Sequence, residues 1–249
     1  MRSLGIIKIG TSNTGVLAAT DLTAPIVRRG RLVDLQDPET WNTLTQTLID
    51  YTTILKDHGV QYGLVSGGEV VRQNRTLCQR IRELGLPLWL VSQDLEGRLT
   101  WAAVKTELPD VSTIIDVGGG STEVVTDRLM YALPVGAAQS PHQTIWPRLD
   151  LPRGTVALVG GTAFALELMS GESHVSRTHL ESLLTAILDG PTPAALLRLH
   201  ATRQKLVVGG SRIIKSLLPM LGAQEFKFAH RGFMEGLWLA ASLGRARFL

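Results

Sequence analysis

Apolar, strand-like runs that end in paired glycines recur four times along this chain of 249 residues, at 62–68, 114–120, 156–161 and 206–210. A strand that ends in glycines presents backbone N–H groups with no Cβ in front of them, and such groups bind anions. A single glycine pair after a strand is more often a tight connection to a helix. The recurrence, with one copy that holds an acid and is rich in Ser and Thr, predicts an α/β protein that handles phosphate groups.

Strand and helix patterns alternate between the glycine segments. Residues 4–9 and 16–20 flank a polar turn at 10–15, which predicts a β-hairpin. The alternation predicts parallel strands covered by helices, in two domains at 1–112 and 113–249, and the second domain is helix-rich. We expect helices over 37–56, 74–84, 95–106, 163–169, 176–188, 193–202, 211–221 and 232–243, and further strands over 87–91, 113–117, 123–125 and 130–133.

Composition excludes several classes of protein. The chain has 25 Lys and Arg against 22 Asp and Glu, and its net charge of +3 is too small for a nucleic-acid-binding surface. The single cysteine, Cys78, excludes a disulfide framework and favours a reducing compartment. No apolar run reaches the roughly 18 residues of a membrane span, and Lys8 interrupts the N-terminal apolar run. We therefore expect a cytoplasmic protein with no DNA partner and no membrane partner.

Two carboxylates bracket the most polar glycine segment. Asp116 lies at the end of a predicted strand, before Gly118, and its side chain shares a face with Ile114. A carboxylate in that position can hold Mg²⁺ or orient a water molecule next to a phosphate. Glu123 is a second carboxylate that could return to the same site. The competing interpretation is that Asp116 only caps the turn.

Two further charged residues follow predicted strand ends. Glu96 lies at the start of a predicted helix, where the helix dipole alone favours an acid, but where a general base could also be placed. Arg72 follows the first glycine pair by four residues, and a guanidinium matches the geometry of phosphate oxygens. A surface arginine is the alternative.

Two motifs together resemble a known family. They are Ile-Asp-Val-Gly-Gly-Gly-Ser-Thr-Glu at 115–123 and Ser-Gln-Asp-Leu-Glu-Gly-Arg-Leu at 92–99, and they are similar to motifs of the exopolyphosphatase and guanosine pentaphosphate phosphohydrolase (Ppx/GppA) family. Segments 159–163, 208–218 and 230–236 follow in the family's order, so the resemblance covers nearly the whole chain. It implies the actin and hexokinase-like (ASKHA) fold, with two ribonuclease-H-like domains and a phosphate cleft between them.

The resemblance also implies a site and a reaction. Glu96 matches the family's catalytic base, Asp116 and Glu123 match the acids associated with a metal and the nucleophilic water, and Arg72 matches a phosphate contact. The implied phosphate loops are formed by Gly10, Thr11, Ser12 and Asn13, and by Gly118, Gly119, Gly120, Ser121 and Thr122. The implied reaction is Mg²⁺-dependent hydrolysis of a terminal phosphoanhydride on polyphosphate or pppGpp, and relatives of this kind are often homodimers.

One departure from the family pattern favours a different function. Lys8 stands where the family has an aspartate in its N-terminal motif. A lysine there could contact phosphate directly and replace part of a metal's charge. The alternative function is therefore a catalytically weak or inactive sensor that keeps the family cleft and binds polyphosphate or a guanosine penta- or tetraphosphate. A small-molecule kinase of the same fold is a third, less favoured possibility.

Overall fold

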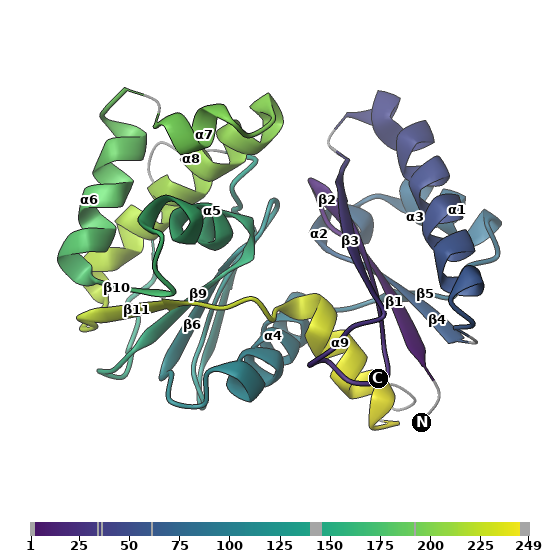
Figure 1. Cartoon of the computed structure of the whole chain (residues 1–249), viewed down its shortest axis with the longest axis horizontal. Coiled ribbons are helices and arrows are strands. Elements are labelled where there is room, and N and C mark those ends of the chain that lie inside the picture. The colour runs from purple at the N-terminus through teal and green to yellow at the C-terminus, as the bar shows by residue number, and fades with distance from the viewer. Residues whose placement is uncertain are drawn as a thin grey trace. The chain divides into compact units, whose positions relative to one another are not determined.

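The computed structural model of the chain describes residues 3–33, 35, 37–60, 62–139, 146–191 and 193–244. These form two compact units (Figure 1). The first unit runs to Thr100 and takes in the segment from Phe233 onward, and the second is Trp101–Gly232. This division differs from the single boundary expected after residue 112. The C-terminal segment belongs to the first unit because helix α9 (Phe233–Ser242) buries Phe233 and Leu237 against Ile6 of that unit.

The first unit is built on a five-stranded sheet in the order β3-β2-β1-β4-β5. Its strands are β1 (Leu4–Ile9), β2 (Asn13–Ala19), β3 (Val27–Leu32), β4 (Tyr62–Gly67) and β5 (Leu88–Leu90). The first three strands are antiparallel, and β4 and β5 continue parallel to β1. The structure confirms the predicted N-terminal hairpin. It also contains β3, which the sequence analysis missed because its arginine-rich sequence lacks apolar alternation.

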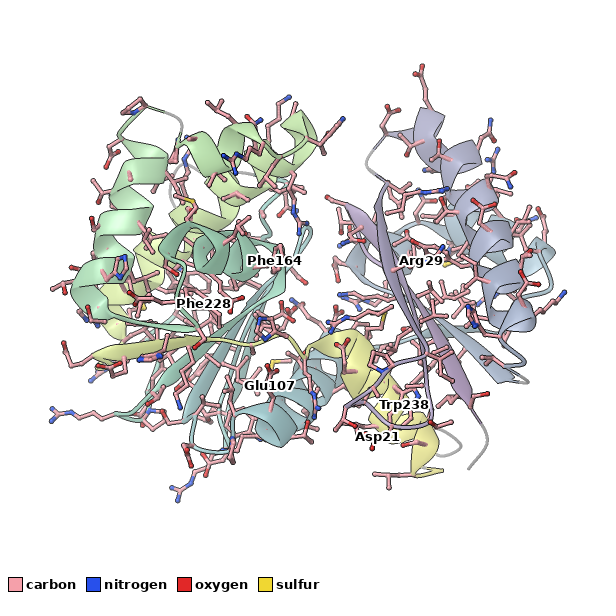
Figure 2. All side chains as sticks on the ribbon, in the orientation of Figure 1. Asp21, Arg29, Glu107, Phe164, Phe228 and Trp238 are labelled. Atoms are coloured by element: carbon pink, nitrogen blue, oxygen red, sulfur yellow. The ribbon has the colours of Figure 1, made fainter. Side chains whose placement is uncertain are left out.

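Helices cover both faces of this sheet. They are α1 (Trp41–Asp57), preceded by the 3-10 turn η1 (Pro38–Thr40), α2 (Glu69–Gln73), α3 (Arg75–Glu83) and α9. Ile7 and Ile9 of β1 pack with α1 and α3, and Ile6 packs with α9 on the opposite face. On the α9 side, Trp238, which is labelled in Figure 2, donates a hydrogen bond from Nε1 to the carbonyl of Ala19 at 3.1 Å.

The second unit repeats the strand order of the first. Its strands are β6 (Thr113–Val117), β7 (Thr122–Val125), β8 (Met130–Leu133), β9 (Val156–Val159), β10 (His174–Ser176) and β11 (Glu225–Phe228). The sheet order is β10-β11-β9-β6-β7-β8, in which β6 to β8 are antiparallel and β9 and β11 are parallel to β6. Counted from β8, the first four strands follow the order third, second, first, fourth, as in the first unit, and β11 takes the fifth place with β10 added at the edge. This duplicated ribonuclease-H-like order confirms the predicted α/β fold class.

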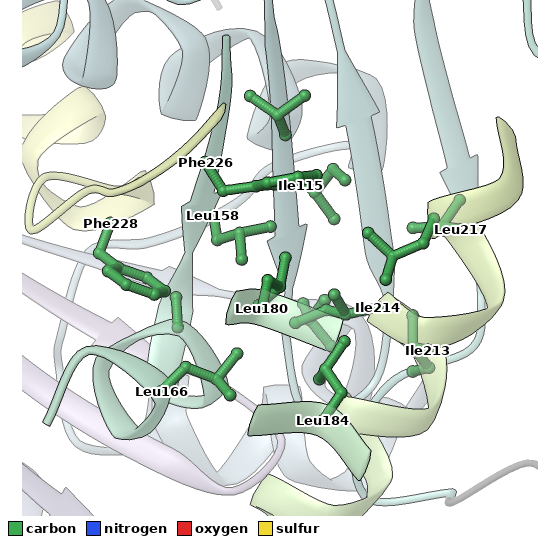
Figure 3. Packing of buried hydrophobic residues seen from close by; sticks show 14 of the residues in the cluster. Ile115, Leu158, Leu166, Leu180, Leu184, Ile213, Ile214, Leu217, Phe226 and Phe228 are labelled. Atoms are coloured by element: carbon green, nitrogen blue, oxygen red, sulfur yellow. The ribbon is translucent and has the colours of Figure 1, made fainter. Parts of the chain in front are cut away.

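The core of the second unit lies between this sheet and three helices (Figure 3). The helices of the unit are α4 (Gln93–Glu107), within which the unit boundary falls, α5 (Gly160–Ser170), α6 (Arg177–Leu188), α7 (Ala194–Leu197) and α8 (Ala201–Leu217), followed by the 3-10 turn η2 (Leu218–Met220). Ile115, Leu158 and Phe226 of the sheet pack against Leu166, Leu184 and Ile214 of α5, α6 and α8. Val104 of α4 packs on the opposite face with Ile114.

The fourth glycine segment is not a strand end, which corrects the sequence analysis. Gly209 and Gly210 lie in the middle of α8, and both are buried. A Cβ on Gly209 would overlap the carbonyl oxygen of Ala137, and one on Gly210 would overlap Oγ1 of Thr162. These glycines therefore let α8 approach its neighbours closely. Among the described helices, none combines the length and apolar character of a membrane span.

Candidate functional site

Two turns occupy equivalent places in the two units. In the first unit, residues 10–12 join β1 to β2, and the N–H of Gly10 donates to the carbonyl of Asn13 at 2.9 Å. In the second, residues 118–121 join β6 to β7, and the N–H of Gly118 donates to the carbonyl of Ser121, also at 2.9 Å. The two segments predicted as phosphate loops are thus structural counterparts.

Both turns leave backbone donors unused. Within the described ranges, no acceptor is hydrogen-bonded to the N–H groups of Thr11, Ser12, Gly119 or Gly120. The carbonyls of two of these residues are satisfied, since Thr11 accepts from the N–H of Leu35 and Gly119 accepts from that of Ala138, both at 2.9 Å. Unpaired backbone donors grouped in one turn form an anion-binding concavity. Each turn can therefore bind a phosphate oxygen through its main chain.

The hydroxyl-bearing residues of the predicted loops are buried. Thr11, Ser12 and Ser121 expose 5–7% of their surface, and Thr122 is fully buried. Thr122 donates its hydroxyl to the carbonyl of Val135 at 2.7 Å, so this side chain holds the segment that packs on the turn. Asn13, the exposed member of the first loop, lies against Gly30, where a Cβ would be 3.3 Å from its Oδ1.

Arg72 and Glu96 form an ion pair in the first unit, and Glu69 joins it. Nη1 of Arg72 lies 3.1 Å from Oε2 of Glu96 and 2.6 Å from the carbonyl oxygen of Val91, and Nε lies 3.1 Å from Oε2 of Glu69. Burial lowers the pKa of the Arg72 guanidinium, but its hydrogen bonds and the charges of the two glutamates outweigh burial and raise the pKa. The predicted phosphate contact is thus already engaged by carboxylates, and it holds Glu96 in place.

Glu96 lies beside the first turn. Glu96 belongs to the N-terminal helical turn of α4, and its side chain is buried. Gly68 lies between this side chain and the loop at residues 10–12, since a Cβ on Gly68 would be 3.9 Å both from Oε1 of Glu96 and from Cα of Gly10. The N–H of Gly68 donates to the carbonyl of Ile9 at 2.8 Å, which fixes these segments together. The family resemblance implies that Glu96 and Gly10 belong to one site, and in the structure both lie next to Gly68.

Asp116 and Glu123 are directly opposite each other on β6 and β7. Opposite residues in an antiparallel pair point to the same face, and both carboxylates are buried, at 8% and 2% exposure. That face is the one of Ile114, as predicted, because Ile115 belongs to the core on the other side. The pairing of the two acids is therefore a consequence of the hairpin register.

Gly160 keeps space for the Asp116 carboxylate. Its φ is +91°, a conformation that favours glycine. A Cβ there would lie 3.1 Å from Oδ1 of Asp116 and 3.0 Å from the carbonyl oxygen of Val117. The glycine segment at 156–161 thus packs against Asp116 of the glycine segment at 114–120.

Arg203 is a charged residue of the second unit that the sequence analysis missed. Its guanidinium packs on the backbone of Gly161, where a Cβ would lie 2.7 Å from Nη1. Burial lowers the pKa of this guanidinium, and across the described part of the chain no carboxylate lies within 4.0 Å of it. In the sequence it stands in a polar helical segment like any surface arginine, so no local signal marks it.

The donor set of the second unit fits magnesium bound together with phosphate. The described residues contain no cluster of three or more His, Cys, Asp or Glu that could hold a metal ion. Asp116 and Glu123 provide two carboxylates on one face. Mg²⁺ is commonly held by one or two carboxylates together with phosphate oxygens and water, so these two acids suffice for that mode of binding.

A cavity of about 450 Å³ lies elsewhere in the first unit, between β3 and α1. Arg29, Arg31, Asp50 and Tyr51 line it. None of the predicted site residues lines this cavity, and the chemistry described above does not use it.

The duplicated strand order and the two equivalent turns define the actin and hexokinase-like fold class, which the sequence resemblance implied. Residues 34–143, under half of the chain, match the Ppx/GppA phosphatase family. This match confirms the resemblance of the chain to that family. The motifs at 159–163, 208–218 and 230–236 lie beyond the matched segment.

Solved structures share the fold over the whole chain. An exopolyphosphatase from Cytophaga hutchinsonii is similar with a TM-score of 0.83 at 18% identity, and the alignment covers 98% of each chain. The Ppx/GppA family member of Aquifex aeolicus is similar with a TM-score of 0.79 at 18% identity, again over 98% of each chain. No curated protein matches the sequence.

Proposed function

We propose that this protein hydrolyses the terminal phosphoanhydride bond of inorganic polyphosphate or pppGpp and releases phosphate. The observation that carries the proposal is the pair of equivalent turns with unpaired backbone N–H groups, one of them beside the buried carboxylate of Glu96. The exopolyphosphatase named above shares the fold, which supports this class of reaction. We also propose a cytoplasmic location and, by analogy with relatives, a homodimer.

Phosphate binding falls to main-chain donors and one arginine. The N–H groups of Thr11, Ser12, Gly119 and Gly120 donate to phosphate oxygens, since no described acceptor occupies them. Arg203 adds a full positive charge beside Gly161. A partly buried guanidinium without a carboxylate partner is stabilised by a bound anion, so this residue is suited to phosphate.

Glu96 takes the proton of the attacking water. Oε2 is held by Arg72 at 3.1 Å, and Oε1 lies on the side of Gly68 and Gly10. In the proposed step a water oxygen bonds to the terminal phosphorus, its proton passes to Oε1, and the bond from phosphorus to the bridging oxygen breaks. The products are phosphate and a chain one unit shorter. Positioning contributes more than acidity in such reactions.

Asp116 and Glu123 are the proposed magnesium ligands. When bound, Mg²⁺ neutralises charge on the phosphate oxygens. The two carboxylates share one face of the hairpin, and a Cβ on Gly160 would lie 3.1 Å from Oδ1 of Asp116.

The test compares phosphate release by the wild type, Glu96→Gln and Asp94→Asn, with long-chain polyphosphate and with pppGpp. Asp94 is the matched control, since it lies in the same helical turn but is exposed and paired with Arg98 at 2.8 Å. We expect Glu96→Gln to lose about 10²-fold or more of the rate and Asp94→Asn to keep it. An unchanged rate in folded Glu96→Gln would remove this residue from the mechanism.

A second candidate function is an anion-binding sensor without turnover. It is favoured by Lys8, a cation beside the first turn that has no carboxylate within salt-bridge distance among the described residues. Tight binding of polyphosphate by the folded wild type, with no phosphate released in Mg²⁺, would favour the sensor over the hydrolase.

A further inference from the structure

Lys8 is a partly buried cation within the central strand of the first unit. Its neighbours across the sheet are Gly15 on β2 and Ser66 on β4. Gly15 has no side chain, and Ser66 is fully buried with an Oγ that has no hydrogen-bond partner among the described residues. Strand alternation puts Lys8 on the face of Ile6, which packs with α9.

The end of the lysine side chain lies between the first turn and an aromatic ring. A Cβ on Gly10 would be 3.8 Å from Cε of Lys8, and Nζ lies 5.1 Å from the centre of the Phe233 ring. The ring face attracts the ammonium and excludes water from one side of it. The charge is therefore held next to the turn whose Thr11 and Ser12 N–H groups are unpaired.

Two other cations of the first unit are paired with carboxylates, whereas Lys8 has no such partner among the described residues. Arg72 is paired with Glu69 and Glu96, and Arg28 lies 3.0 Å from Glu235. Throughout the described ranges, no carboxylate lies within 4.0 Å of Nζ of Lys8. A partly buried charge without a counter-ion is unfavourable, and an anion at the adjacent turn would relieve that cost.

We infer that Lys8 and the turn at 10–13 form a phosphate-binding site that does not require a divalent metal. The phosphate is that of the proposed substrate, so the ligand class rests on the proposed function. A metal ion at this turn would repel the ammonium, whereas a phosphate group accepts hydrogen bonds from it and from the two N–H groups. Metal binding is thereby left to the second unit, where the paired acids lie.

The test is calorimetric titration of the full chain with tripolyphosphate in EDTA. The variant Lys8→Met keeps the stem against Phe233 and removes the charge, and the control Lys56→Met removes an exposed charge in the last turn of α1. We expect binding by the wild type, a loss of at least about 10-fold in affinity for Lys8→Met, and no change for Lys56→Met. Circular dichroism verifies that each variant is folded.

Each outcome separates this inference from the proposed hydrolysis. Equal affinity of the wild type and Lys8→Met in EDTA overturns the inference, as does wild-type binding that appears only with Mg²⁺. Loss of binding in Arg203→Met but not in Lys8→Met also overturns it, because the anion is then held by the second unit. Lys8-dependent binding in a protein that releases no phosphate leaves the inference standing and contradicts the hydrolase.

Discussion

Nη1 of Arg72 lies 3.1 Å from Oε2 of Glu96, and the same guanidinium also binds Glu69. All three side chains expose 10–17% of their surface, so the ion pair is largely shielded from solvent. Arg72 thus orients the carboxylate that lies beside the first turn and leaves Oε1 on the side of Gly10.

Replacing Arg72 with Met is expected to misplace Glu96 and reduce turnover by about 10- to 100-fold, with a smaller change in KM. We also expect a loss of about 1.5–3 kcal/mol in the free energy of unfolding, because two buried carboxylates lose their charged hydrogen bonds. A change in KM with kcat intact would instead assign Arg72 to phosphate binding.

Gly160→Ala should disturb Asp116, whereas Gly171→Ala should not. Both glycines have a positive φ, at +91° and +71°, but nothing lies within 4 Å of a Cβ on Gly171. Each variant is expected to lose about 1–3 kcal/mol in urea unfolding through backbone strain. Only Gly160→Ala should also weaken the Mg²⁺ dependence of phosphate release. Equal Mg²⁺ titration curves for the two variants would show that Gly160 does not influence the proposed metal site.

Arg203→Met is expected to weaken substrate binding without a loss of stability. Its guanidinium is desolvated and, over the described residues, has no carboxylate partner, so removing it relieves an unfavourable charge. We expect KM for polyphosphate to rise about 10-fold and the melting temperature to stay equal or increase. Arg198→Met is the control, since Arg198 is exposed at the end of α7. Lower stability together with unchanged KM would assign Arg203 to packing alone.

His230 makes the stability of the second unit depend on pH. Its Nδ1 lies 3.0 Å from Glu107 and its Nε2 lies 2.8 Å from Glu167, so both ring nitrogens face carboxylates. Burial lowers the pKa of His230, but hydrogen bonds and the charges of the two glutamates raise it by more, to above the usual 6.5. The protonated ring therefore stabilises the folded state. This contribution is complete below the unfolded-state pKa and is lost as pH rises through the folded-state pKa.

The measurement is the difference in melting temperature between the wild type and His230→Gln across pH. Half of the ring is exposed, so solvent screening limits the contribution to about 1 kcal/mol or less. We expect the difference to be larger at about pH 5.5 than at about pH 9. His58→Gln, at the exposed C-cap of α1, is the control for replacing a histidine elsewhere in the chain. A difference that does not change with pH would contradict the assigned charge state.

Local patterns predicted the parts of the fold that depend on alternation. The N-terminal hairpin follows from apolar alternation around a polar turn, and the face that Asp116 shares with Ile114 follows from strand geometry. The same patterns did not predict β11. They also assigned Gly209 and Gly210 to a strand end, because a glycine pair looks alike in a turn and in a close helix contact. Only packing with Ala137 and Thr162 distinguishes the two.

Contacts between residues far apart in the chain could not be predicted from local sequence patterns. Arg203 packs on Gly161 from a helix about forty residues further along the chain, and its polar surroundings resemble a solvated surface. Glu69 is three residues from Arg72, a spacing that predicts contact on a helix, but not that Glu96 shares the guanidinium. Burial and the absence of a described counter-ion are what mark Lys8 and Arg203.

The most direct test of the central claim is phosphate release from long-chain polyphosphate by the wild type, in Mg²⁺ and in EDTA, with product chain lengths resolved on a gel. We expect Mg²⁺-dependent release of single phosphates, chains that shorten progressively from their ends, and loss of both in Glu96→Gln. Folded wild-type protein that binds polyphosphate but releases no phosphate at any Mg²⁺ concentration would contradict it.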